Sequence, residues 1–185
     1  LGDNLERTTQ GGGIYTYTSQ QGAAAFRDTG SFDAAGSLSQ ENAEAFCRDF
    51  CKAFSYDTPI FTLDETGSGT ATAVRLWNGT PVFNAAVTFT IDQGRVLSAS
   101  GALLPEAGAE TSSGQKPLSA FAALTAFQQM RHASSSVVSS ITEVSLCYEL
   151  QSTTAAPMAL VPSWRIVTDT ATFYVNCISG TVRRA

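Results

Sequence analysis

The sequence predicts an α+β protein of two tandem units, each a helix packed on an antiparallel β-sheet. Two strand pairs carry this prediction, because residues 160–182 form two strand patterns joined by a tight turn and residues 81–100 have the same plan. β-branched and aromatic residues dominate both segments, as is typical of half-buried strands. Apolar residues at helical spacing precede each pair, so a helix can cover one face of each sheet.

The first unit is predicted over residues 14–104. Residues 1–13 are polar and end in three glycines, which indicates a flexible lead-in. Ser39 is the expected N-cap of the first helix, because its hydroxyl can accept a hydrogen bond from an unpaired backbone N–H. The helix should end near Ser55, and its apolar face comprises Ala43, Phe46, Cys47, Phe50, Cys51 and Phe54. Strands are expected at 60–63, 70–77, 81–92 and 95–104.

The second unit is predicted over residues 117–185, after a polar, aperiodic linker at 105–116. Ser119 is the expected N-cap of its helix. The buried stripe of that helix should comprise Phe121, Leu124, Phe127 and Met130. A strand at 141–150 follows, and then the strand pair at 160–182.

Landmarks at matched distances predict an internal repeat. The two helix starts are 80 residues apart, and a proline followed two residues later by an aromatic residue recurs after 81. Chance likeness between two helix–sheet segments is the alternative. The repeat-equivalent structural positions are Ser39 with Ser119, Pro81 with Pro162 and Phe83 with Trp164.

The second strand pair contains VPSWRIVTD at 161–169, YVN at 174–176 and GTV at 180–182. This pattern resembles the end of a PepSY-like unit. With PVFN at 81–84 in the first unit, the tandem arrangement resembles the YycI/YycH family over residues 30–185.

Members of that family are extracytoplasmic, membrane-anchored accessory regulators of a cell-wall sensor kinase in Gram-positive bacteria. The resemblance therefore implies a non-catalytic domain that modulates a membrane partner by protein–protein contact. The implied partner is a sensor kinase or a paralogous regulator. The sequence opens on polar residues, and the family's N-terminal membrane helix is not seen, so a membrane anchor is expected upstream of residue 1. The family has no catalytic residues and no cofactor to transfer.

Composition narrows the possible partners and sites. The chain has 185 residues, 43% hydrophobic content and a net charge of −5, so it can form a core. No basic cluster exceeds Arg183 and Arg184, which argues against nucleic acid. No apolar run approaches the roughly 20 residues of a membrane span. The four cysteines lack a CxxC pair, which argues against a metal site; buried free thiols are favoured over disulfides, without excluding them.

The sequence does not predict an enzyme. His132 is the single histidine, and its place near the end of the second helix suits a cation at a helix C-terminus. No G-x-S-x-G nucleophile motif occurs, and the glycine loop at 67–69 lacks the lysine of a phosphate-binding loop.

Tyr15 and Tyr17 are the candidate interaction residues, because they lie on a strand that is expected at an exposed sheet edge. Packing against the sheet is the alternative role for aromatic residues of this kind. Two other functions stay open at this point. One is a protease-inhibitor or propeptide-like module, since PepSY units also occur in protease propeptides. The other is a small-ligand sensor that binds in a cleft between the two units.

Overall fold

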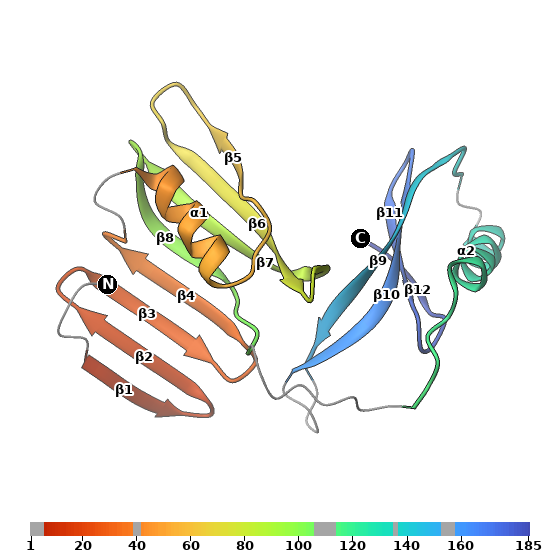
Figure 1. The fold of residues 1–185 in the computed structure, drawn as a ribbon, viewed down its shortest axis with the longest axis horizontal. Helices are drawn as coiled ribbons and strands as arrows, with labels where there is room; N and C mark the ends of the chain where they lie inside the picture. The colour runs from red at the N-terminus through yellow and green to blue at the C-terminus, as the bar shows by residue number, and fades with distance from the viewer. Residues whose placement is uncertain (1–5, 39–41, 106–113, 135–136, 153–157) are drawn as a thin grey trace.

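The described part of the chain forms two helices and twelve strands in the computed structural model (Figure 1). The structure describes residues 6–38, 42–105, 114–134, 137–152 and 158–185. The helices are α1 (Ala43–Ala53) and α2 (Ala120–Ser134). The strands are β1 (Glu6–Gly11), β2 (Ile14–Ser19), β3 (Gly22–Arg27), β4 (Ser31–Gly36), β5 (Ile60–Leu63), β6 (Gly69–Trp77), β7 (Thr80–Asp92), β8 (Arg95–Ala102), β9 (Ile141–Gln151), β10 (Ala159–Thr168), β11 (Thr172–Asn176) and β12 (Val182–Arg184). We call residues 6–104 the first half and residues 118–185 the second half.

All twelve strands belong to one mixed sheet. Its order is β1-β2-β3-β4-β8-β7-β9-β10-β11-β12, with β6 paired to β7 and β5 paired to β6. Neighbouring strands are antiparallel except β7 and β9, which pair in parallel at Val82 and Tyr148. The prediction of two tandem PepSY-like units, each with a helix on its own antiparallel sheet, is therefore wrong. The first half supplies eight strands and the second half four.

The pairing of distant segments explains this error. An alternating pattern shows which residues of a strand face the core, but it does not name the neighbouring strand. Ser31 pairs with Ala102, and Val82 pairs with Tyr148. No local signal in the sequence marks either partner, so the extent of the sheet is set by tertiary contacts.

Residues 6–11 form the edge strand β1. The prediction of a flexible lead-in over residues 1–13 is therefore wrong for this part of the segment. The glycines that indicated a linker instead make the β1–β2 hairpin turn, because Gly11, Gly12 and Gly13 have φ values of 75°, 60° and 74°. Glycine adopts such left-handed conformations without steric cost, so three in a row allow the chain to reverse. The predicted linker at 105–116 lies largely outside the described residues.

α1 begins at Ala43, three residues later than a Ser39 N-cap predicts, and Ser39 lies outside the described residues. Its N-cap is Asn42, whose Oδ1 accepts a hydrogen bond of 3.1 Å from the N–H of Ala45. The Ala43 N–H donates to the carbonyl of Gly94 at 2.9 Å. The start of the helix is thereby tied to the turn between β7 and β8.

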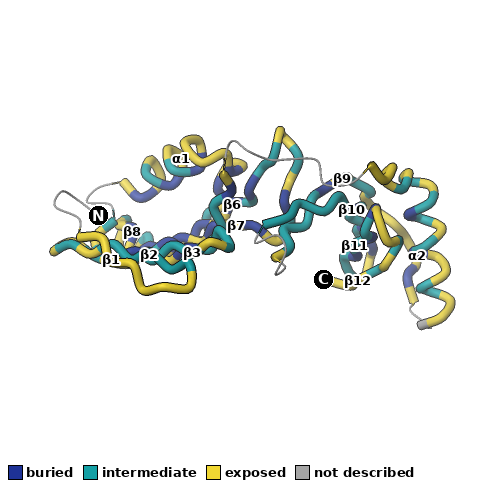
Figure 2. The backbone as a smooth tube through the Cα atoms, turned by 90° about the horizontal axis from the view of Figure 1, so that it is seen from below, coloured by how far each residue is buried: buried dark blue, intermediate teal, exposed yellow. Residues whose placement is uncertain are grey.

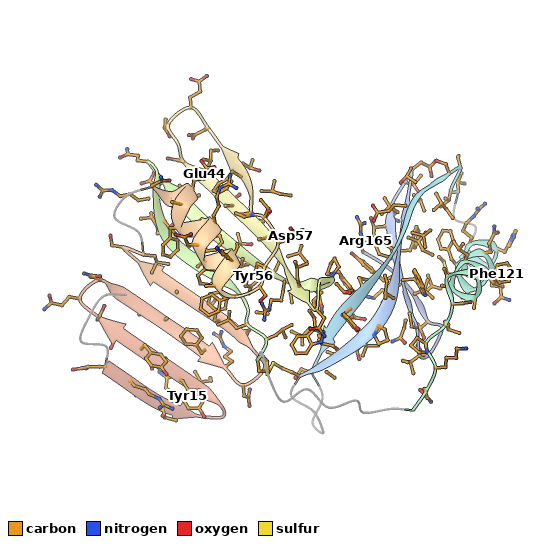
Figure 3. The ribbon with its side chains drawn as sticks, in the orientation of Figure 1. Tyr15, Glu44, Tyr56, Asp57, Phe121 and Arg165 are labelled. Carbon is orange, nitrogen blue, oxygen red and sulfur yellow. The ribbon has the colours of Figure 1, made fainter. Side chains whose placement is uncertain are left out.

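α2 begins at Ala120, and Ser119 lies at its predicted N-cap position with its Oγ accepting the Ala122 N–H at 3.3 Å. The predicted buried stripe is wrong at one end. Phe121 is 81% exposed and Ala123 is fully buried instead, whereas Phe127 is fully buried as expected (Figure 3). Apolar residues lie on several sides of α2, so its sequence does not specify which side is buried. The surface on which the helix packs decides that.

Each helix covers its own apolar core. The buried side of α1 faces the strands of the first half (Figure 2), in a cluster that includes Phe32, Cys47, Cys51, Val87 and Phe89. α2 packs on the second half through Ala123, Phe127, Ile166, Phe173 and Val175. Neither helix, as far as it is described, is long and apolar enough to span a membrane.

Candidate interaction surface

β1 is the last strand of the sheet on the side of the first half. It pairs with β2 in a register that places Arg7 opposite Tyr17 and Thr9 opposite Tyr15. All six residues of β1 are exposed. The outer edge of a terminal strand carries unpaired backbone N–H and C=O groups, which can hydrogen-bond to another extended chain. Within the described residues, no strand pairs with this outer edge.

Tyr15 and Tyr17 are half-buried on β2. The Arg7 guanidinium lies over the Tyr15 ring, 5.0 Å from its centroid (Figure 3 labels Tyr15). Tyr17 packs edge-to-face on Phe26 with 5.7 Å between the ring centroids. The ring of Phe26 in turn stacks on Phe32 at 6.0 Å. An aromatic row therefore runs from the core under α1 to the edge of the sheet, and its outer end is partly accessible.

A second cluster of aromatic and charged side chains joins the two halves. In β7 the register with β6 jumps, because Val74 pairs with Ala86 while Arg75 pairs with Val82. The residues skipped by this bulge include Phe83 and Asn84, which contact the second half instead. A bulge redirects side chains in this way because it breaks the regular alternation of the ladder.

Asn84 continues the sheet with its side chain. Its Nδ2 donates to the carbonyl of Leu150 at 2.7 Å, and its Oδ1 accepts the Leu150 N–H at 2.7 Å. The carboxamide thus offers the same donor and acceptor as a backbone peptide. It extends the pairing of β7 with β9 beyond the Val82–Tyr148 bridge.

Phe83 stacks on Tyr174 with ring centroids 3.7 Å apart and an interplanar angle of 16°. Arg183 lies over both rings, and its Nη2 is 3.0 Å from the Glu149 carboxylate. Burial raises the pKa of Tyr174, so the phenol stays protonated at neutral pH. We call this contact between the two halves the joint. It combines a stacked layer of three side chains, Phe83, Tyr174 and Arg183, with one partly buried ion pair.

The apolar centre of this joint comprises Val82, Ala85 and Leu104, with Tyr148 and Leu150 packed against them. Val82 and Ala85 are fully buried. Side chains thus fill the described part of the region between the halves. This packing argues against a ligand-binding cleft at that position, which the small-ligand hypothesis requires.

The repeat-equivalent positions have different surroundings in the two halves. Trp164 donates its Nε1–H to the carbonyl of Leu118 at 2.9 Å, which holds the segment before α2 against β10. Phe83 packs across the joint on Tyr174 instead. Pro81 pairs with Leu76 in the β6–β7 hairpin, and Pro162 pairs with Tyr148 across β9 and β10. The internal repeat stays a prediction.

Within the described residues, no contact joins the histidine to a cysteine. His132 lies exposed in the last turn of α2. All four cysteines are free and buried. Burial raises the pKa of Cys47 to about 12 and that of Cys51 to about 11. Desolvation likewise raises the pKa of Cys147 to about 12, so these groups are thiols and poor nucleophiles at neutral pH.

Two residues of these surfaces, Asn84 and Arg7, are not predicted from the sequence. Asn84 interrupts a run of strand-forming residues, TPVFNAAVTF, and asparagine is depleted in strands. That interruption was the available signal for a side chain that bonds to backbone. Arg7 carries no such signal, because it lies in the polar stretch 1–13, whose composition indicates a flexible lead-in.

No family model matches the sequence, and no curated protein matches it. Among solved structures, an uncharacterized protein from Eubacterium rectale ATCC 33656 aligns with a TM-score of 0.50 and 12% identity, over 98% of this chain and 71% of that chain. The C-terminal domain of Bacillus megaterium YpeB aligns with a TM-score of 0.45 and 12% identity, over 98% of this chain and 88% of that chain. The first likeness concerns the fold alone, and the second is too low to carry an argument. The resemblance to the YycI/YycH family stays a prediction.

Proposed function

We propose that this chain is a non-catalytic protein-binding domain whose β1 edge accepts an extended segment of a partner. The observation that carries the proposal is that β1 ends the sheet and exposes all six of its residues. Strand addition gives affinity through backbone hydrogen bonds and specificity through alternate side chains. On the sheet face that carries Tyr15 and Tyr17, an incoming strand would meet the Arg7 side chain, which lies over the Tyr15 ring.

The chemistry of the described residues supports a non-catalytic role. The cysteines are buried as protonated thiols, and the histidine is exposed at a helix end. Tyr15 and Tyr17 are placed to contribute contact area beside the edge, since aromatic side chains are enriched at protein interfaces.

The resemblance to YycI/YycH supports a finer proposal. The partner is then a membrane protein, such as a sensor kinase or a paralogous regulator, and the domain works outside the cytoplasm on a membrane anchor. Contact with this domain would modulate the activity of the partner. These statements rest on the sequence resemblance.

Purified extracytoplasmic domains of sensor kinases from the source organism provide the test. Amide hydrogen exchange is compared with and without each domain, and a bound partner should slow exchange in residues 6–11. Arg7→Glu should weaken binding about tenfold, because it reverses a charge beside the incoming strand. Arg184→Glu is the matched control, since Arg184 is an exposed arginine on β12 at the other end of the sheet. Unchanged exchange in β1, or equal loss in both variants, would refute the proposal.

A further inference from the structure

β5 is a second edge of the sheet and differs in character from β1. It pairs with β6 and, among the described residues, with no other strand. Its sequence is IFTL, without a charged residue. Ile60 is 72% exposed and Leu63 is 45% exposed. Natural edge strands are usually protected by charges, proline or bulges. An apolar edge without a charge in the strand is therefore open to pairing with another strand.

The two faces of β5 offer different surfaces. Phe61 and Leu63 lie on the face that carries α1, because Phe61 pairs with Ala71, a member of the core under the helix. They border a shallow trough of about 430 Å³, whose other walls include Asn42 at the start of α1 and Arg95 after the β7–β8 turn. Apolar side chains, among them Phe61, Leu63 and Ile91, line part of this trough, and the Arg48 guanidinium of α1 lies over the Phe61 ring, 5.8 Å from its centroid. Aliphatic side chains of an added strand would extend this surface.

Carboxylates flank this edge at both ends. Asp57 lies before β5 (Figure 3), and Asp64 and Glu65 follow it. All three are exposed, and none forms an ion pair with another described residue. Hydrogen bonds from Thr66 and Ser68 lower the pKa of Asp64, which keeps that carboxylate ionised at neutral pH. A short apolar strand between acidic ends is complementary to an apolar segment between basic ends.

We propose that the β5 edge binds an extended apolar segment of another protein that carries basic residues at both ends. This site is separate from the β1 edge, which lies at the other end of the first-half strands. A domain with two such edges can hold two partner segments at once. The proposal does not depend on the one made for β1.

A labelled peptide tests the proposal. The probe is fluorescein-Lys-Lys-Val-Thr-Val-Thr-Val-Lys-Lys, and its acidic counterpart has glutamate in place of each lysine. Fluorescence anisotropy should show at least about tenfold tighter binding of the basic peptide, with the preference falling as salt is added. Ile60→Lys should weaken this binding about tenfold, because it places a cation on the edge and removes apolar contact.

Leu97→Lys is the matched control, since Leu97 is 41% exposed on β8, a strand that is paired on both sides. It adds the same charge without touching the edge, so binding should persist. Arg7→Glu should also leave the peptide affinity unchanged, which separates this site from β1. Equal binding of the two peptides, or equal loss in the Ile60 and Leu97 variants, would overturn the proposal. So would concentration-dependent dimers in sedimentation that Ile60→Lys abolishes, because the edge would then bind a second copy.

Discussion

Asn84→Asp is a minimal change that tests whether the side-chain amide couples the two halves. The new carboxylate can still accept the Leu150 N–H, which lies 2.7 Å from the present Oδ1. It places an ionised oxygen where Nδ2 now donates to the Leu150 carbonyl at 2.7 Å. One hydrogen bond is thereby replaced by the repulsion of two oxygens, with almost no change in side-chain volume.

The expected cost is about 1 to 2 kcal/mol. An intramolecular hydrogen bond contributes a net of about 0.5–1.5 kcal/mol to the free energy of unfolding. Asn84 is exposed, so water competes for its amide, and losing this bond should cost an amount near the lower limit of that range. The new carboxylate oxygen also faces the Leu150 carbonyl oxygen, and this repulsion lowers the stability by a further amount of similar size. The same repulsion raises the folded-state pKa of the new carboxyl group, because it disfavours the ionised form. Stability is therefore lost as pH rises through that pKa and should return toward wild type near pH 3.

Each half contains one tryptophan, Trp77 in β6 and Trp164 in β10, so fluorescence can follow both halves. In urea, the wild type should show one transition for both probes, read separately in Trp77→Phe and Trp164→Phe backgrounds. Asn84→Asp should lower the stability and separate the two transitions at pH 7. The control is Asn78→Asp, an equal charge change at an exposed turn residue with φ 49°, which aspartate also tolerates. If Asn84→Asp costs no more than this control, the coupling role is wrong.

Three further predictions concern the second half and the thiols. Phe127→Ala should cost about 3–5 kcal/mol in urea unfolding, because it leaves a cavity at a fully buried position; a loss below about 1 kcal/mol would contradict the core described for α2. Asp169 accepts backbone hydrogen bonds from Ser139 and Ser140, and although desolvation raises its pKa, these bonds lower it overall. Its contribution is therefore present above the unfolded pKa of about 3.9 and lost as pH falls through the lower folded value, so Asp169→Asn should flatten the acid limb of the stability–pH curve. At pH 8, a thiol reagent should label Cys47 at the rate of unfolding, because burial raises its pKa to about 12; rapid labelling in native buffer would argue against that burial.

Local patterns placed most of the individual elements. The strand pair at 160–182 corresponds to β10 and β11, and the helical stripes lie on α1 and α2. Ser119 lies at the N-cap where a hydroxyl before an apolar run predicts it. Local patterns gave a wrong prediction at three points: the glycines at 11–13 form a hairpin turn, Asn42 caps α1, and Phe121 of α2 is exposed.

The sequence by itself predicted most of the strands and helices and many of the residues that face a core, because these properties depend on neighbours a few positions away. The strand β1 and the exposed Phe121 are exceptions. Only the tertiary structure decided that the strands form one mixed sheet, with β1 and β5 as edges of the first half. It also decided that Asn84 bonds to Leu150, a residue 66 positions away. Such contacts depend on how separate segments meet in space, and alternation along one strand carries no information about its partner.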